Sequence, residues 1–208
     1  MPKHQRKHNK WKQFFFWLVG INVLILLGIL TLIFWPVSET ETPTPSDHTT
    51  QPSSEFTVRT TKQNVNELVN AYIEKLLDDS DHQYSVSLEE DVELVGELPV
   101  FSSTVPVTVH LEPAVQKNGD VILKQESISI GQLALPNKKI MEYLKKYLPM
   151  PEWVTVDPKN EEIYVAVTDM QIRSNLNVSV ESFDLKSNNL AFNIEIPYET
   201  LGIEKRYY

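Results

Sequence analysis

The chain contains few residue types that could do chemistry, and they are scattered. It has no cysteine, which excludes thiolate nucleophiles, cysteine-ligated zinc and disulfide bonds. Beyond the N-terminal 35 residues its histidines are His48, His82 and His110. They fall in a linker, a helix exit and a strand, so a three-histidine zinc site would require the linker to fold back. His110 alternates with Val109 and Leu111, which favours a solvent-facing strand position over a catalytic role.

Two acidic runs are the next candidates. The run 78–81 lacks the spacing and the closing glutamate of a calcium loop, so we interpret it as a solvated turn. The run 89–91 could be a carboxylate pair, but adjacent strand residues point to opposite faces, which favours a charged edge. No G-x-S-x-G nucleophile motif and no G-x-x-x-x-G-K-S/T phosphate loop occurs. We therefore predict that the protein is not an enzyme, with no catalytic residues, no metal site and no cofactor.

The segment between residues 133 and 156 is unusually apolar. Much of it must form core, but a curved sheet around a helix can also leave an elongated apolar groove. Tryptophan and methionine at its lip would suit a flexible acyl chain. Both interpretations stay open at this point. The candidate groove residues are Leu133, Leu135, Ile140, Leu144, Leu148 and Trp153.

The N-terminal region predicts where the protein lies. Residues Phe14 to Trp35 carry no charge, and 22 residues are enough to span a bilayer core of roughly 30 Å. Five basic residues lie in the tail 1–13, whereas the segment after the helix is acidic. The positive-inside rule then places the N-terminus in the cytoplasm and the rest outside. A cleavable signal peptide is the alternative, but its apolar region would be shorter and would end in small residues. We expect a single-pass signal anchor in the cell membrane.

A linker and one folded domain follow the anchor. Residues 36–55 are mostly Pro, Ser, Thr and Glu, which predicts a disordered stalk. Residues 56–208 are long enough to bury a core unaided and form the predicted extracellular domain. The formal charge of the whole chain is −9, although the N-terminal tail contributes five positive charges. Such an acidic domain is not expected to bind nucleic acid.

Hydrophobic periodicity predicts the secondary structure of this domain. An apolar stripe from Val65 to Leu77 indicates a helix capped by Thr60 or Thr61, and a second helix is expected between 131 and 149 with Asn137 as its cap. Alternating apolar residues predict strands around 84–88, 105–111, 163–167, 176–180 and 190–196, and 121–123 follows a turn. Turns are expected at 118–119, 157–160 and 188–189. The predicted fold class is α+β, a long curved antiparallel meander sheet packed with two helices.

Several short motifs carry a resemblance to a known family. They are Leu98-Pro99-Val100-Phe101, Val105-Pro106-Val107, Leu111-Glu112-Pro113, Asn118-Gly119-Asp120-Val121, Ile128-Ser129-Ile130-Gly131, Leu133-Ala134-Leu135-Pro136 and Leu148-Pro149-Met150-Pro151-Glu152-Trp153-Val154. With the anchor and stalk, they make the chain resemble the YpmS family of Gram-positive membrane-anchored proteins. That resemblance implies location and architecture and no catalytic residue, because the family's activity is unknown. More distantly, the order of elements resembles bacterial tubular lipid-binding domains, in which a curved sheet wraps a helix to form a lipid slot.

The functional prediction combines these observations. We expect an extracellular, non-catalytic cell-envelope domain that binds a lipid or a lipid-linked envelope component, held near the bilayer by Phe14 to Trp35. The alternative is a scaffold or accessory subunit that binds another envelope protein. A lipid binder should show an apolar tunnel, a scaffold a filled core with an exposed apolar patch, and an enzyme a polar cleft with convergent titratable groups.

Overall fold

The computed structural model describes residues 10–33, 53–78, 83–100, 103–130, 136–170, 172, 176–200 and 202. The chain divides into two compact units, Met1–Pro36 and Val37–Tyr208. The first unit contains α1 (Lys10–Ile33), which over Phe14–Thr31 is long and apolar enough to cross a membrane. The rest of the predicted N-terminal tail, residues 34 and 35 of the predicted span, and most of the predicted stalk lie outside the described residues.

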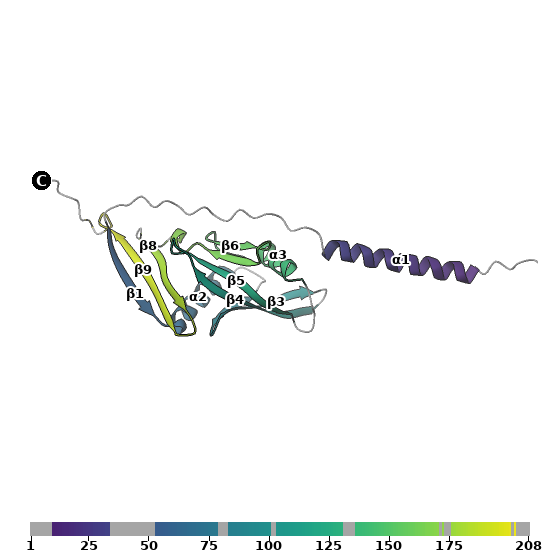
Figure 1. Ribbon diagram of the computed structural model, residues 1–208, viewed down its shortest axis with the longest axis horizontal. Coiled ribbons are helices and arrows are strands. Elements are labelled where there is room, and N and C mark those ends of the chain that lie inside the picture. Colours follow the sequence, from purple (N-terminus) through teal and green to yellow (C-terminus); the bar gives the residue numbers. More distant parts are fainter. Residues whose placement is uncertain are drawn as a thin grey trace, which may run out of the picture. The chain divides into compact units, whose positions relative to one another are not determined.

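The described strands of the second unit form two antiparallel sheets (Figure 1). The smaller sheet has the order β1-β9-β8, and the larger has the order β2-β3-β4-β5-β7-β6. The strands are β1 (Ser53–Thr60), β2 (Tyr84–Leu88), β3 (Val92–Val100), β4 (Ser103–Val115), β5 (Val121–Ile130), β6 (Val154–Asp157), β7 (Glu162–Val165), β8 (Asn177–Asp184) and β9 (Asn189–Pro197). The remaining elements are α2 (Lys62–Leu77), α3 (Asn137–Tyr147) and the 3-10 helix η1 (Val167–Asp169).

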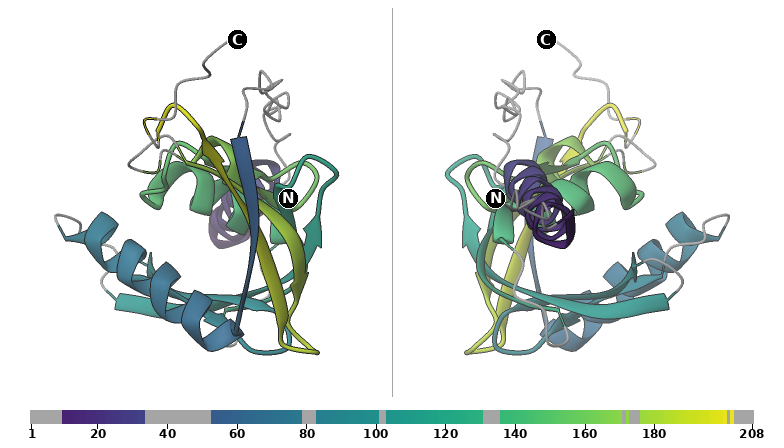
Figure 2. Two further views of the ribbon diagram at one scale, coloured as in Figure 1. Left: turned by 90° about the vertical axis from the view of Figure 1, so that its left-hand side faces the viewer. Right: turned by 90° about the vertical axis from the view of Figure 1, so that its right-hand side faces the viewer.

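The predicted α+β class and the curved antiparallel sheet are confirmed. Strands β2 to β5 pair in chain order, as a meander does, and Figure 2 shows their curvature. The predicted turns also form: Gly119 takes a φ of +89° between β4 and β5, and Asn188 a φ of +53° between β8 and β9. Left-handed backbone of this kind favours Gly and Asn, which is why these dipeptides mark hairpins. The strands do not all share one sheet, because β1, β8 and β9 pair separately.

Three strands have no counterpart in the predicted set. β1 begins at Ser53, three residues before the expected start of the domain, and pairs with β9 from Ser53↔Pro197 to Thr60↔Leu190. Its apolar residues Phe56 and Val58 are exposed, so β1 has no buried face to produce a strong pattern. β3 and β6 are the other two, and β6 has only four residues.

The predicted N-cap is confirmed for α2 and wrong for α3. Thr61 is the N-cap of α2, and its Oγ1 accepts a hydrogen bond from the backbone N–H of Asn64 at 3.3 Å. The prediction for α3 is wrong, because Pro136 is its N-cap and Asn137 is already the first helical residue. Pro136 has a φ of −61° and no side-chain acceptor, and its carbonyl accepts a hydrogen bond from the N–H of Lys139 at 2.9 Å.

The core lies between α3 and one face of the larger sheet. Ile140, Met141 and Leu144 of α3 are buried against inward-facing residues of β2 to β7, such as Val109 and Leu111. Alternation along the strands turns the neighbouring residues to the opposite face. That opposite face is therefore free to carry polar side chains.

Helix α2 lies along β2, the edge strand of the larger sheet. The side chain of Asn70 accepts a hydrogen bond from the N–H of Val86 at 2.9 Å and donates one to its carbonyl at 2.7 Å. Asn66 Oδ1 accepts another from the N–H of Leu88 at 3.1 Å. These amides pair with backbone groups of the edge strand that another strand would otherwise bind. The predicted apolar stripe is only partly buried, since Leu68 of α2 remains 71% exposed.

Candidate functional site

The described part of the domain has two candidate binding sites, and the first lies under α3. A small apolar pocket separates this helix from the inner face of β2, β3 and β4, and its volume is about 20 Å³. We call it the α3 seam. It is lined by Tyr84, Leu94, Gly96, Glu97, Val107, Val109, Tyr143, Leu144 and Leu148.

Some of the predicted groove residues line the α3 seam and others do not. Leu144 and Leu148 line it, whereas Ile140 is buried in the core beside it and does not. Trp153 packs its ring against Tyr72 of α2, with 5.8 Å between the ring centroids. Leu133 and Leu135 lie outside the described residues. Of the four described candidates, Ile140 and Leu144 are buried, and Leu148 and Trp153 are partly buried.

Tyrosines surround the seam. The Tyr84 hydroxyl donates a hydrogen bond to the carbonyl of Pro149 at 2.6 Å, which joins β2 to the segment after α3. Burial, and then the neighbouring Tyr72, raises the pKa of Tyr84. On α3 the rings of Tyr143 and Tyr147 lie 4.8 Å apart, and burial, then Tyr147, raises the pKa of Tyr143. An apolar pocket lined by two tyrosines, Tyr84 and Tyr143, suits a ligand that is apolar at one end and polar at the other.

The second site is a polar cleft on the opposite face of the larger sheet. Its volume is about 530 Å³, and it extends from the turn before β3 across β4 and β5 to the hairpin of β8 and β9. We call it the acidic cleft, because seven carboxylates and a single lysine line it. The lining residues are Glu89, Glu90, Asp91, Glu93, His110, Glu112, Pro113, Glu126, Phe183, Asp184, Leu185 and Lys186.

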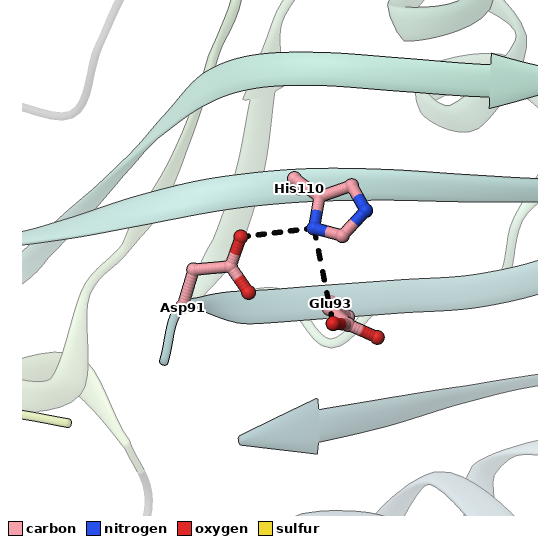
Figure 3. Close-up of side chains that lie close together, drawn as sticks. All are labelled: Asp91, Glu93 and His110. Carbon is pink, nitrogen blue, oxygen red and sulfur yellow. Dashed lines mark hydrogen bonds and ion pairs between the residues drawn. The ribbon is translucent and has the colours of Figure 1, made fainter. Parts of the chain in front are cut away.

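Three side chains converge within the acidic cleft. His110 Nδ1 lies 2.9 Å from Asp91 Oδ2 and 3.9 Å from Glu93 Oε1 (Figure 3). One donor atom from each residue lies within 4.8 Å of the other two, a spacing that could hold a metal ion. The side chains are 23 to 32% exposed, so solvent reaches all three.

Strand pairing explains why these residues meet. In the antiparallel pair β3 and β4, Glu93 stands directly opposite His110, so their side chains share one face. Asp91 lies just before β3 in the turn from β2. A register shift after His110 on β4 breaks the regular pairing with β5. Bulges of this kind often occur beside functional sites, where they redirect side chains.

Lys62 connects the two walls of the acidic cleft. Its Nζ donates a hydrogen bond to the carbonyl of Glu89 at 2.9 Å and lies 3.3 Å from the Glu89 carboxylate. Its backbone N–H donates to Asn188 Oδ1 at 2.8 Å, in the hairpin of β8 and β9. The first residue of α2 therefore holds both the β2–β3 turn and the β8–β9 hairpin.

The sequence pattern indicates the positions of some residues of the acidic cleft but not of all of them. His110 does lie on the polar face of its strand, whereas Glu89 to Asp91, expected as a charged strand edge, lie in the turn between β2 and β3. Glu93 cannot be identified in this way, because a single sequence does not contain the register that places Glu93 opposite His110. The available signal is the alternation of apolar and polar residues on both strands. Glu93 lies between the buried Val92 and Leu94, and His110 lies between the buried Val109 and Leu111.

A third polar cluster is buried and closed. Asp120 is 2% exposed, and its carboxylate accepts hydrogen bonds from the hydroxyl of Tyr164, from Asn118 Nδ2 at 2.6 Å and from the N–H of Thr168 at 3.0 Å. Burial, then the hydrogen bond to Asp120, raises the pKa of Tyr164. No buried side-chain polar atom among the described residues lacks a hydrogen-bond partner. We interpret this cluster as structural, since no donor or acceptor is left for a ligand.

Comparison with known proteins places the chain in a family. The family described as "Uncharacterized protein conserved in bacteria" (DUF2140) matches residues 9–196. The chain is also 28% identical to "Uncharacterized protein YpmS" of Bacillus subtilis (strain 168) over 190 residues, 91% of this chain and 98% of that protein. No solved structure matches the chain. Because the family match runs from α1 into β9, the chain belongs to this DUF2140 family, and its resemblance to YpmS is confirmed.

Proposed function

We propose that this protein is a membrane-anchored binding protein whose extracellular domain takes up the apolar chain of a lipid or lipid-linked envelope component at the α3 seam. The observation that carries the proposal is the seam itself, an apolar pocket with tyrosines around it. The N-terminal helix, long and apolar enough to cross a membrane, would keep the domain near such ligands.

The seam must open for this function. A volume of about 20 Å³ holds roughly one water-sized group, far less than an acyl chain needs. Binding therefore requires α3 to move away from β3 and β4. The hydrogen bond from Tyr84 to the Pro149 carbonyl is one of the contacts that would have to break or move. Burial of the acyl chain would offset that cost at about 0.8 kcal/mol per methylene group.

The test uses the full chain in nanodiscs that contain a phospholipid with a photoreactive acyl chain. We expect crosslinks to α3 or β3 in the wild type, in addition to crosslinks to α1. Leu148→Trp should fill the seam and remove the crosslinks to α3 and β3. Val95→Trp is the matched control, because Val95 is 37% exposed on the other face of β3.

The crosslinks to α1 report that the probe reached the protein in every sample. Equal labelling of α3 and β3 in Leu148→Trp and Val95→Trp would contradict the seam as the binding site. Labelling confined to α1 in the wild type would contradict lipid binding by the domain.

A protein partner is the second candidate function, and α2 favours it. Leu68 and Tyr72, one helical turn apart, are 71% and 42% exposed. Exposed apolar residues on one helix face are typical of surfaces that bind another protein. A photoreactive amino acid at Leu68 would capture such a partner in cells, whereas the same group at the exposed Glu67 should not.

A further inference from the structure

We propose that Asp91, Glu93 and His110 form a binding site for a first-row divalent transition metal ion, with zinc as the best-matched ion. The proposal goes beyond lipid or protein binding and does not depend on it. It uses the opposite face of the larger sheet from the α3 seam, so the two sites can be tested separately.

The distances between the donor atoms are close to those of a tetrahedral zinc site. Zinc binds imidazole nitrogen and carboxylate oxygen at about 2.0 to 2.2 Å, so neighbouring donors of a tetrahedral site lie roughly 3.4 Å apart. The distances from His110 Nδ1 to Asp91 Oδ2 and Glu93 Oε1, 2.9 and 3.9 Å, lie on either side of that value. Rotations of these side chains, a quarter to a third exposed, would equalise the distances. Figure 3 shows both carboxylates directed at the same ring nitrogen.

The mixed donor set identifies the class of ion. Calcium and magnesium prefer shells made only of oxygen, whereas imidazole suits zinc and its neighbours in the first transition row. An imidazole between two carboxylates therefore differs from the exposed carboxylates elsewhere in the acidic cleft. Three protein ligands would leave the fourth position of a tetrahedral ion open to the cleft.

The surroundings favour a cation. Seven carboxylates line the acidic cleft against the single Lys186, so its potential is negative. Lys62 pairs with Glu89 at the margin and is not among the residues that line the cleft. The cleft volume of about 530 Å³ leaves a path for an ion and its remaining water ligand.

Ion binding would change the hydrogen bonding of His110. Without a metal ion, Nδ1–H can donate to Asp91 Oδ2 across the 2.9 Å separation. Coordination through Nδ1 requires the lone pair on that nitrogen, so the ring proton must reside on Nε2. The two states therefore differ in tautomer, which nitrogen NMR of the imidazole ring detects directly.

The experiment measures Zn²⁺ binding to the full chain in detergent micelles, prepared without a polyhistidine tag. We expect the wild type to bind one Zn²⁺ more tightly than Ca²⁺ or Mg²⁺. His110→Gln and Glu93→Gln should each weaken binding at least about tenfold, since even outer-shell changes cost 10- to 100-fold. Glu112→Gln is the matched control, because it removes the same charge from the same cleft without removing a proposed ligand.

Each result decides the question. Weakening in His110→Gln and Glu93→Gln but not in Glu112→Gln, together with a Zn²⁺-induced shift of the His110 Nδ1 resonance, supports the site. Equal weakening in Glu93→Gln and Glu112→Gln would show diffuse attraction to the acidic cleft and overturn the proposal. Unchanged affinity in His110→Gln, or no binding by the wild type at millimolar Zn²⁺, would do the same. The NMR shift is measured on the wild type, so a variant that fails to fold does not remove the test.

Discussion

At the scale of single residues, Gly119 meets the strictest steric demand among the described glycines. It adopts a φ of +89° in the turn between β4 and β5, and a Cβ built there would lie 2.4 Å from Ser179 Cβ. Its carbonyl accepts a hydrogen bond from the N–H of Val180 at 2.7 Å. The turn of the larger sheet is therefore in direct contact with β8 of the smaller sheet, and a side chain at this position would separate them.

We predict that Gly119→Ala lowers the free energy of unfolding by at least about 2 kcal/mol, because it adds backbone strain and a steric overlap. Gly202→Ala is the control, since Gly202 has a φ of +67° but the added Cβ would meet no atom of another described residue within 4 Å. It should cost roughly 1 kcal/mol, from the strain of left-handed backbone alone. Urea unfolding of the two variants measures both values. Similar losses in both would show that backbone conformation, and not contact with Ser179, sets the cost.

At the residue scale, the sequence predicts turn positions well but does not predict which side chains meet across strands. Asn118-Gly119 and Asn188 reveal their turns, because few residue types tolerate left-handed backbone. The grouping of Asp91, Glu93 and His110 depends on the register between two strands, which one sequence does not contain. The candidate groove residues Ile140 and Leu144 are equally apolar whether they line a slot or fill a core, and the structure buries both.

At the scale of elements, prediction succeeded where a segment has one buried face and failed where it has none or is short. α3 and β4 bury a regular set of residues, and their periods are clear. β1 buries little, and β6 has four residues. α2 lies between these cases, because its attachment depends on Asn66 and Asn70 as well as on Ile73. A hydrophobic pattern cannot report amide side chains that bind the edge of a sheet.

We predict that Asn70→Ala destabilises the domain by roughly 1 to 3 kcal/mol, because the N–H of Val86 loses its partner at a half-buried site. Amide hydrogen exchange should increase at Val86 and along α2 before it increases in β4. Asn64→Ala serves as the control, since that residue is exposed on α2 and its side chain bonds only to Thr60 among the described residues. Unchanged protection of Val86 in Asn70→Ala would contradict the role assigned to this amide.

At the scale of the whole molecule, the central question is on which side of the membrane the domain lies. The helix α1 is long and apolar enough to span, but its length alone does not orient it. The orientation argument depends on the basic residues before the helix and the acidic segment after it. An extracellular domain is also the condition under which the α3 seam meets envelope lipids and the acidic cleft meets extracellular metal ions.

The absence of cysteine makes this orientation directly measurable, because any introduced thiol is unique in the chain. We predict that Glu90→Cys, at an exposed position in the turn before β3, reacts with a membrane-impermeant maleimide in intact bacterial cells. Lys3→Cys, in the basic N-terminal tail, should react only after the cells are permeabilised. The positive-inside rule requires this difference, because translocating the five basic residues is unfavourable. The reverse pattern would place the domain in the cytoplasm, where the seam could meet only inner-leaflet lipids, and the proposed function would have to be reconsidered on that basis.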